Sequence, residues 1–272
     1  MIDLHLHTTA SDGRLSPSNL VARAAAAGLT VVSVTDHDTT AGLEEAGRAA
    51  GESGIRLVSG IEITAVEAGQ DVHVLGYFFD PADPRLSDFL RVQRADRVRR
   101  VHEIAERLRA MGCAIDTRSL IAQGSGAGAS VGRPHVADAL VTAGHAADRA
   151  DAFDRLIGRG RPAFVPRKGA STAEVVSVIR VAGGIASLAH PGLTQRDDLL
   201  RSLAASGLAA LEARHSDHDA VTETRYRDLA AQYGLAVSGG SDFHGDNSHH
   251  AAGLGTITLP AEDFAALQER VA

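Results

Sequence analysis

Short apolar runs alternate with helical stretches along most of this chain, and this alternation limits the possible folds more than any other feature. Eight runs have the length and composition of buried strands, at residues 2–7, 30–37, 55–63, 72–79, 184–190, 208–214, 235–242 and 254–259. Helical stretches follow at 16–28, 39–54, 171–183 and 219–234, each capped by Ser, Thr or Asp and ended by Gly. This order predicts an α/β fold built around a mainly parallel sheet.

The alternation is interrupted between residues 87 and 165, where every readable segment is helical. The helices are expected at 86–112, 116–124, 133–144 and 149–160, and a Gly/Ser stretch at 124–130 joins two of them. We therefore expect one domain from residues 1–86 and 166–272, with a helical insertion at 87–165. The Arg-rich stretch 91–109 also contains Asp and Glu, so we interpret it as a solvated helix face with i,i+4 ion pairs.

Composition excludes several classes of protein. A net charge of -7 over 272 residues argues against a general nucleic-acid or membrane-surface binder. The single cysteine rules out a disulfide framework or a thiolate metal cluster and fits a reducing compartment. No apolar run reaches the roughly 20 residues of a membrane span, and the first residues lack the pattern of a signal peptide. We expect a cytoplasmic protein with no membrane partner and no obligate protein partner.

Several predicted strands end in side chains that bind metals. Because the carboxyl ends of the strands in a β/α barrel meet on one face, these side chains are expected to share one site. A turn at 67–71 predicts a hairpin, which would bring the start of the strand at 72–79 to the same face. One histidine at a strand end is weak evidence, but the joint pattern is not. The set comprises His5, His7, Asp12, His37, Glu62, His73, His190, Asp242 and His244.

Nine nitrogen and oxygen ligands are too many for one ion, because a zinc site usually has three or four. They predict two or three metal ions with Glu62 or Asp242 as a bridging carboxylate. Imidazole and carboxylate without sulfur suit Mn, Fe or Zn. We expect Asp3, deeper in the first strand, to hydrogen bond to a histidine ligand. We interpret His102, His145, His249 and His250 as solvated or structural.

The motifs DLHLHTTASDG, VTDHDT, GIE, HVLGY, AHPG and GGSDFH resemble those of the PHP family, named for polymerase and histidinol phosphatase domains. The insertion with GRPHVADAL, and the return through AFVPRKGAST, are similar to one branch of it. That branch consists of stand-alone metal-dependent phosphoesterases, among them nucleoside 3′,5′-bisphosphate phosphatases and 5′-to-3′ exoribonucleases. The resemblance implies a distorted barrel of seven β/α units with a trinuclear metal centre at the strand ends.

The resemblance also implies roles for individual residues. It assigns one metal to His5, His7, Glu62 and Asp242, a second to Glu62, His73 and His190, and a third to Asp12, His37 and His244. Mn is the favoured ion, with Zn or Fe as alternatives. Arg133 and Arg167, with Lys168 as a helper, would bind substrate phosphates, and their places before helix starts agree with this. We add His215 as a candidate substrate contact, with a purely structural loop role as the alternative.

The implied reaction is attack on phosphorus by a hydroxide that bridges the metals, with Glu62 and Asp242 as the catalytic ligands. A metal-bound water and Asp38 are the two candidates for the acid that protonates the leaving group. The expected substrate is a small phosphorylated nucleotide such as a nucleoside 3′,5′-bisphosphate, and short RNA 5′ ends are a further candidate. Histidinol phosphatase, against which the GRPH insertion argues, and a non-catalytic metal-binding module are the alternatives.

Overall fold

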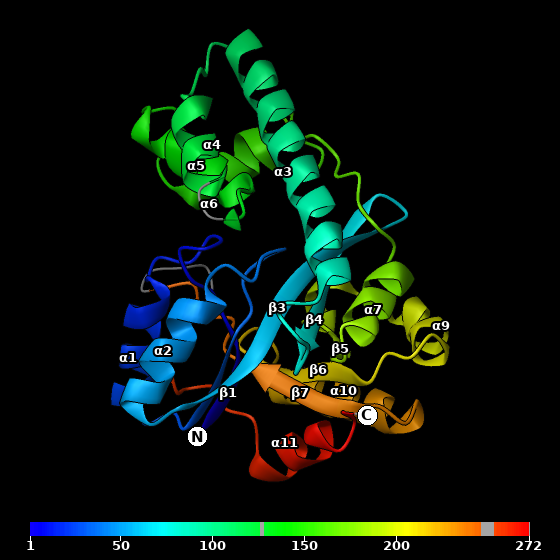
Figure 1. The fold of residues 1–272 in the computed structure, drawn as a ribbon. Coiled ribbons are helices and arrows are strands. Elements are labelled where there is room, and N and C mark those ends of the chain that lie inside the picture. Colours follow the sequence, from blue (N-terminus) through cyan, green and yellow to red (C-terminus); the bar gives the residue numbers. More distant parts are fainter. Residues whose placement is uncertain (126–127, 246–252, 272) are drawn as a thin grey trace.

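Seven strands form a single sheet in the order of the sequence, and the sheet curls into a nearly closed barrel (Figure 1). The computed structural model describes residues 1–125, 128–245 and 253–271. The strands are β1 (Ile2–Leu6), β2 (Val31–Val34), β3 (Arg56–Glu67), β4 (Gln70–Tyr77), β5 (Ile185–Leu188), β6 (Ala210–His215) and β7 (Ala236–Gly240). This confirms the predicted α/β fold of the distorted barrel type and seven of the eight predicted strands.

The sheet is parallel except at β4, which runs antiparallel to both β3 and β5. The β3–β4 hairpin pairs Glu67 with Gln70 next to the turn and Thr64 with His73 further in. The predicted hairpin is therefore confirmed. As a result, the beginning of β4 lies at the same end of the barrel as the carboxyl ends of the parallel strands.

The barrel is closed where β7 meets β1. The amide of His7 donates to the carbonyl of Phe243 at 3.0 Å, and the amide and hydroxyl of Ser241 donate to the Asp3 carboxylate at 3.0 and 2.6 Å. A Cβ on Gly240 would lie 2.4 Å from the backbone nitrogen of His5, so the close approach of the strands requires glycine here. Asp3 thus joins β1 to β7. The hydrogen bond to a histidine ring that we predicted for Asp3 is not formed among the described residues, because its carboxylate accepts from Ser241 and from the backbone amide of His5.

Seven α-helices and a short 3₁₀-helix (Asp197–Leu199) accompany the strands of the barrel in the described part of the chain. Ser16, Ser171 and Asp219 cap three of them, as predicted, and Ser171 in addition forms a capping box with Glu174. The helix after β2 begins at Leu43 without a side-chain cap, so the Thr cap expected near residue 39 was wrong. The seven α-helices of the barrel are α1 (Pro17–Ala26), α2 (Leu43–Ser53), α7 (Thr172–Val181), α8 (Pro191–Thr194), α9 (Leu200–Ala205), α10 (Ala220–Gln232) and α11 (Ala261–Gln268).

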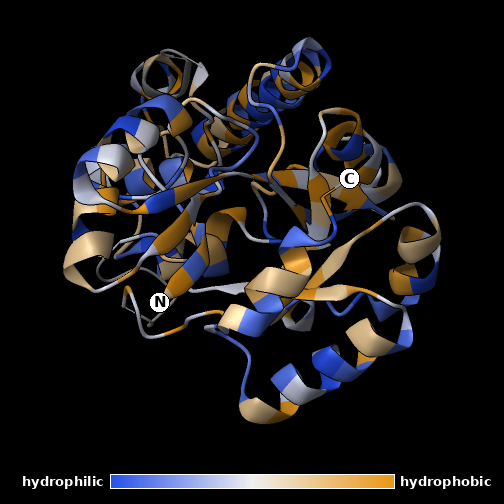
Figure 2. Ribbon diagram, turned by 60° about the horizontal axis from the view of Figure 1, so that its bottom comes forward, coloured by the Kyte–Doolittle hydropathy of each residue, from blue (hydrophilic) through white to orange (hydrophobic). Residues whose placement is uncertain are grey.

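The apolar segment 254–259 is not a strand. Residues 254–256 form a turn and residues 258 and 259 are irregular, although the amide of Leu259 donates to the carbonyl of Ile2 at 2.8 Å. Leu259 packs with Phe264 and Leu267 of α11 against Ile2 and other residues of the barrel core. The segment is apolar because it covers one end of the barrel with α11, opposite the insertion (Figure 1). In Figure 2 the strands are mainly hydrophobic, whereas the helices mix hydrophobic and hydrophilic residues.

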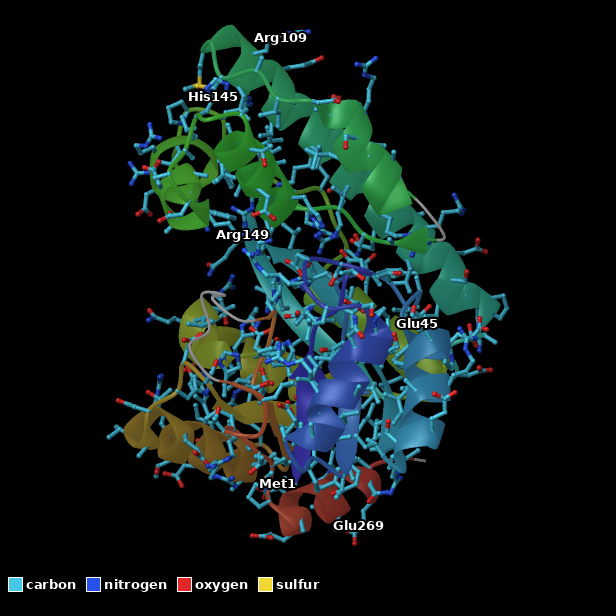
Figure 3. All side chains as sticks on the ribbon, turned by 90° about the vertical axis from the view of Figure 1, so that its left-hand side faces the viewer. Met1, Glu45, Arg109, His145, Arg149 and Glu269 are labelled. Carbon is cyan, nitrogen blue, oxygen red and sulfur yellow. The ribbon has the colours of Figure 1, made fainter. Side chains whose placement is uncertain are left out.

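The insertion forms a separate helical layer above the strand ends (Figure 1). Leu86 and Leu90 of its first helix pack in the barrel core, whereas Ile104 and Leu108 of the same helix pack in a second core within the insertion. Figure 3 shows Arg109 and His145 at the end of the insertion far from the barrel. The helices are α3 (Pro84–Ala110), α4 (Thr117–Ser125), α5 (Arg133–Thr142), α6 (Arg149–Ala152) and a π-helix (Phe153–Ile157).

Candidate active site

All nine residues predicted as metal ligands lie together at the end of the barrel that faces the insertion. The ligand atoms of eight of them form overlapping groups, and within each group every atom lies within 4.8 Å of the others. His190 belongs to none of these groups, although its Nε2 lies 3.1 Å from Glu62, and the group that holds Glu62 and His73 contains His37 in its place. Two groups match the ligand sets implied by the family resemblance, except that His7 joins the group around Asp12. These groups are His5, His7, Glu62 and Asp242, and His7, Asp12, His37 and His244.

Glu62 lies at the centre of the cluster. Its Oε1 is 2.7 Å from Nδ1 of His73 and 3.1 Å from Nε2 of His190. Its Oε2 is 3.2 Å from Nε2 of His7 and 3.2 Å from Nδ1 of His37. One carboxylate thus faces histidines from four different segments, an arrangement in which it could bridge two ions.

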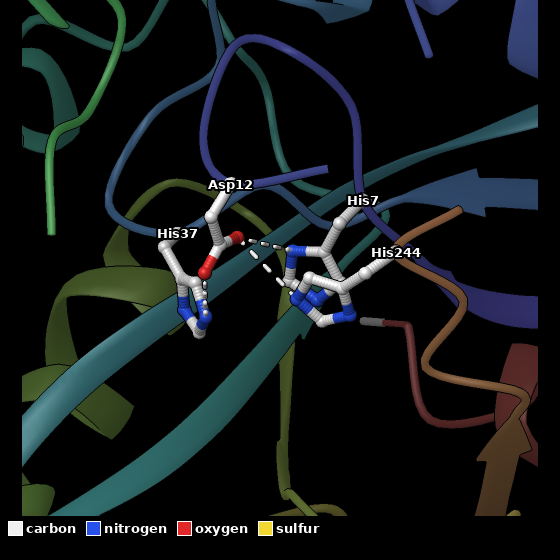
Figure 4. Close-up of side chains that lie close together, drawn as sticks. All are labelled: His7, Asp12, His37 and His244. Atoms are coloured by element: carbon white, nitrogen blue, oxygen red, sulfur yellow. Dashed lines mark ion pairs between the residues drawn. The ribbon is translucent and has the colours of Figure 1, made fainter. Parts of the chain in front are cut away.

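Two aspartates extend the cluster on either side of Glu62. Oδ1 of Asp242 lies 3.2 Å from Nε2 of His5 and 3.1 Å from Nε2 of His7. Asp12 lies 3.3 Å from Nε2 of His244, and 3.8 Å from the nearest nitrogens of His37 and His7 (Figure 4). Asp242 has a backbone φ of +53°, a strained conformation of the kind that collects at functional sites.

The chemistry of these side chains fits divalent metal ions. Nε2 of His7, Oδ1 of Asp12, and Nδ1 of both His37 and His73 are buried and lie between 2.7 and 3.3 Å from other polar atoms of the cluster, but among the described residues none of these contacts has the geometry of a hydrogen bond. Buried polar atoms without partners are rare, and here they face one another across a few ångströms. Burial lowers the pKa of His37 to about 3, whereas Asp242 and Glu62 outweigh the effect of burial on His7 and raise its pKa to about 10. A metal ion that binds His7 must therefore displace a proton.

Glu212, which the sequence did not reveal as a site residue, supports two of the ligands. Its Oε1 accepts a hydrogen bond from Nδ1 of His5 at 2.9 Å, and its Oε2 accepts from the amide of His190 at 2.7 Å. It lies within β6 and not at the end of that strand. The available signal was a single acidic residue in the apolar run LAALEAR.

His215 lies behind the cluster and not in the cavity. Its Nδ1 accepts from the amide of Asp217 at 3.1 Å, and its Nε2 lies 3.4 Å from Oδ2 of Asp242. The side chain is fully buried. Its place therefore suits the orientation of Asp242 better than the contact with substrate that we had expected. His218 connects α8 with β6, because it accepts from the amide of Gly192 at 3.2 Å and contacts the carbonyl of Ala213 at 2.8 Å.

Two adjoining cavities lie between the insertion and the barrel. One, of about 230 Å³, lies over the predicted ligands and is also lined by Arg149, Phe153 and Leu193. The other, of about 130 Å³, is lined by Arg97, Arg100, Arg133 and Arg167. Both include His37 and His73 in their walls, so the metal-binding cluster and the arginines share one continuous region.

Two arginines that line the second cavity have N–H groups without a hydrogen-bond acceptor among the described residues. Arg100 and Arg133 lie 3.2 and 3.4 Å from Oδ2 of Asp71. However, Nη2 of Arg100 and Nε of Arg167 are buried without a partner among the described residues. Burial lowers the pKa of Arg100 to about 10, which leaves it charged at pH 7. Charged donors without acceptors are suited to bind an anion such as phosphate.

The arginines of α3 correct our interpretation of residues 91–109 as a solvated face. Arg99 does pair with Asp96 and Glu103, both at 2.6 Å, as an exposed helix face would. Arg97 and Arg100 instead point inward and line the cavity. The Lys168 side chain is exposed and does not line either cavity.

Asp38 connects the barrel to the insertion and is unsuited to act as an acid. Its Oδ2 accepts from Nε of Arg97 at 2.5 Å and from Arg167 at 2.6 Å, and its Oδ1 accepts from the amide of Thr64 at 3.0 Å. Burial alone would raise the pKa of Asp38, but the two guanidinium groups hold it well below its usual value. A carboxylate in this setting stays ionised and has no proton to give to a leaving group.

A barrel of this kind, with histidines and carboxylates gathered at its strand ends, places the chain among the β/α-barrel hydrolases. The chain belongs to the PHP domain family, whose model matches residues 3–156. A 5′-3′ exoribonuclease of Haemophilus influenzae is 37% identical, with 89% of each chain covered. A 3′,5′-nucleoside bisphosphate phosphatase of Chromobacterium violaceum is 34% identical, covering 89% of this chain and 87% of the relative.

Solved structures agree with this assignment. A Bifidobacterium adolescentis protein described as a candidate metal-dependent phosphoesterase superposes with a TM-score of 0.91 at 36% identity, covering 100% of this chain and 96% of its own. An amidohydrolase of Chromobacterium violaceum with bound sulfate superposes with a TM-score of 0.86 at 32% identity, covering 100% and 97%. Among the described residues, no helix has the length and apolar character needed to cross a membrane.

Proposed function

We propose that this protein is a metal-dependent phosphatase that removes a terminal phosphate from small nucleotides carrying a second phosphate, such as nucleoside 3′,5′-bisphosphates. Its relatives make it a hydrolase of phosphoester bonds. The observation that carries the choice of substrate is the pair of adjoining cavities, one over the ligand cluster and one lined by arginines. A substrate with two phosphates fills both.

The ligand cluster is proposed to hold three divalent ions, with Mn favoured and Zn or Fe as alternatives. The first ion is assigned to His5, His7, Glu62 and Asp242, the second to Glu62, His73 and His190, and the third to Asp12, His37 and His244. When bound, such ions would supply positive charge near the phosphoryl oxygens and would lower the pKa of a water molecule.

The rest of the site is proposed to bind and orient the nucleotide. Arg100, Arg133 and Arg167 hold the phosphate that is not hydrolysed, and this fixes the reacting phosphate over the cluster. Phe153 and Leu193 give the cavity over the ligands an apolar wall that suits the nucleoside. Arg149 lines the same cavity and is fixed by Asp138, whose two oxygens accept its Nε and Nη2 at 2.6 Å.

Two other substrates and a non-catalytic role serve as comparisons. The exoribonuclease relatives make the 5′ end of short RNA a further substrate to test. Histidinol phosphate has one phosphate and a cationic amine, so the arginine-lined cavity disfavours it. A purely metal-binding module would release no phosphate from any of these compounds.

Phosphate release with Mn²⁺ supplied tests the proposal. The wild type is expected to hydrolyse adenosine 3′,5′-bisphosphate with a higher kcat/KM than adenosine monophosphate or histidinol phosphate. Arg100→Gln and Arg133→Gln should each raise KM for the bisphosphate by about tenfold or more, because a charge-assisted hydrogen bond is lost. They should change KM for the monophosphate little.

Arg91→Gln is the matched control, since Arg91 lies on the same helix, is largely exposed and pairs only loosely with Asp88 at 3.6 Å. It should leave both KM values unchanged. Equal losses for the bisphosphate and the monophosphate in the cavity variants would count against a second phosphate site. No phosphate release by the wild type would count against the enzyme itself.

A further inference from the structure

The insertion is attached to the two barrel loops that carry Asp12 and His37. The amide of Ser130 donates to the carbonyl of Ala10 at 2.8 Å. The Thr39 hydroxyl donates to the carbonyl of Gly128 at 2.7 Å. In contrast, His5 and Glu62 lie within β1 and β3, where the sheet itself holds their backbone.

His135 makes the most specific of these attachments. Its Nδ1 accepts from the amide of Gly132 at 3.1 Å, so the ring proton is on Nε2. Nε2 donates to the carbonyl of Ser11 at 2.9 Å, one residue before Asp12. The Ser11 hydroxyl in turn donates to Asp36 at 2.6 Å. The start of α5 thus fixes the backbone from which the Asp12 carboxylate projects.

The loop with His37 is held by the insertion in a similar way. Asp38 follows His37 and accepts hydrogen bonds from Arg97 of α3 and from Arg167 of the return segment. Arg94 of α3 also donates to the carbonyl of Asp38, at 3.1 Å. The insertion therefore adds contacts to both loops beside those within the barrel, such as the bonds from the amide of Ser11 to the carbonyl of Thr8 at 3.0 Å and from the amide of Asp38 to the carbonyl of Glu62 at 2.8 Å.

We infer that the insertion completes the third metal site, formed by Asp12, His37 and His244, and that His135 is the positioning residue that connects the two. This inference rests on the ligand set of the proposed function but not on its substrate. A loop that must be ordered before it binds an ion loses affinity by the free energy of ordering, whereas ligands fixed in the sheet do not. The third ion is expected to bind more weakly once the contact is removed.

The coupling is reciprocal. If docking of the insertion favours the third ion, then that ion favours the docked insertion to the same extent. Metal occupancy and the position of the layer that covers the cavities are therefore linked. This gives two independent measurements, the number of bound ions and the protection of the insertion from protease.

The test compares His135→Ala with the wild type after removal of all metal and equilibrium dialysis against defined free Mn²⁺. The wild type should hold three ions per chain. His135→Ala should hold two at the same free Mn²⁺, because loss of a residue that orients a ligand typically weakens metal binding by about 10- to 100-fold. Mn²⁺ should also protect the insertion of the variant less from protease.

His145→Ala is the matched control. This second histidine of the insertion also places its Nε2 near a backbone carbonyl, that of Ala114 at 3.2 Å, but within the insertion. Figure 3 shows it far from the barrel. It should retain three ions. His135→Gln, which keeps a side-chain donor, should restore part of the third-site affinity.

Three ions bound by His135→Ala with wild-type affinity would overturn the inference. Equal weakening of all the ions would also overturn it, because the contact would then act on the whole fold. Selective loss of one ion supports it even if the wild type hydrolyses none of the nucleotides offered. In that case the proposed substrate fails and the coupling stands.

Discussion

Glu212 accepts a hydrogen bond from Nδ1 of His5 at 2.9 Å, and neither side chain is exposed to solvent. This contact places the ring proton of His5 on Nδ1 and turns Nε2 toward Glu62 and Asp242. The other oxygen of Glu212 accepts from the amide of His190. One buried carboxylate therefore orients the ring of His5 and holds the backbone of His190, two predicted ligands that are far apart in the sequence.

Glu212→Gln should weaken metal binding by about 10- to 100-fold, because a neutral amide orients and polarises His5 less well than a carboxylate. Equilibrium dialysis against Mn²⁺ measures the effect directly. Glu223→Gln is the control, since Glu223 pairs with Arg214 and Arg227 and none of the predicted ligands. Wild-type metal affinity in the Glu212 variant would show that the contact has no role in the site.

Asp38→Asn should lower the free energy of unfolding by about 3–5 kcal/mol, because it leaves the buried Arg97 and Arg167 without their carboxylate. Urea denaturation with the metal removed measures this stability separately from ion binding. Asp88→Asn removes an exposed pair with Arg91 and should change stability by less than about 0.5 kcal/mol. Similar values for the two variants would contradict the role assigned to Asp38.

Gly240→Ala should destabilise the protein by about 1–3 kcal/mol, since the added methyl group meets the backbone of His5 at the barrel seam. Gly51→Ala is a control for the same substitution in α2, where an added Cβ meets nothing within 4 Å. It should stabilise the helix by about 0.5–1 kcal/mol. Thermal unfolding of both variants should therefore give shifts of opposite sign, and a Gly240→Ala variant as stable as the wild type would show that the seam tolerates a side chain.

Asp83→Asn should change the acid dependence of stability. Asp83 caps α3, and its ion pair with Arg85 lowers the pKa of the carboxyl to about 2 from a usual 3.8. A lowered folded-state pKa adds stability above about pH 4 that is lost as the pH falls toward 2. The stability difference between wild type and variant should shrink over that interval. A difference independent of pH would mean that the capping hydrogen bonds matter and the charge does not.

The sequence allowed us to predict those site residues whose position follows from the direction of the strands. Parallel strands end on one side, so His37 and Asp242 could be placed together, and the hairpin added His73. Glu212 was missed because an acidic residue within a strand has no positional signal until neighbouring strands surround it. Arg97 and Arg100 were assigned to solvent because helical spacing alone does not tell which face another layer will cover. The segment 254–259 has the composition of a strand, but the sheet is completed without it.

The long helix α3 has a consequence for how this protein can change. At about 1.5 Å per residue its 27 residues extend roughly 40 Å. It continues unbroken from Leu90 in the barrel core, past Arg97 and Arg100, to Leu108 in the insertion core. One residue inserted after Leu90 would rotate everything beyond it by about 100° and turn Arg97 away from Asp38. Amino-acid replacements on the outer face of α3 are therefore tolerable, whereas single-residue insertions and deletions are not. The number of residues in this helix determines where its arginines point, and the active site depends on that number as well as on the side chains themselves.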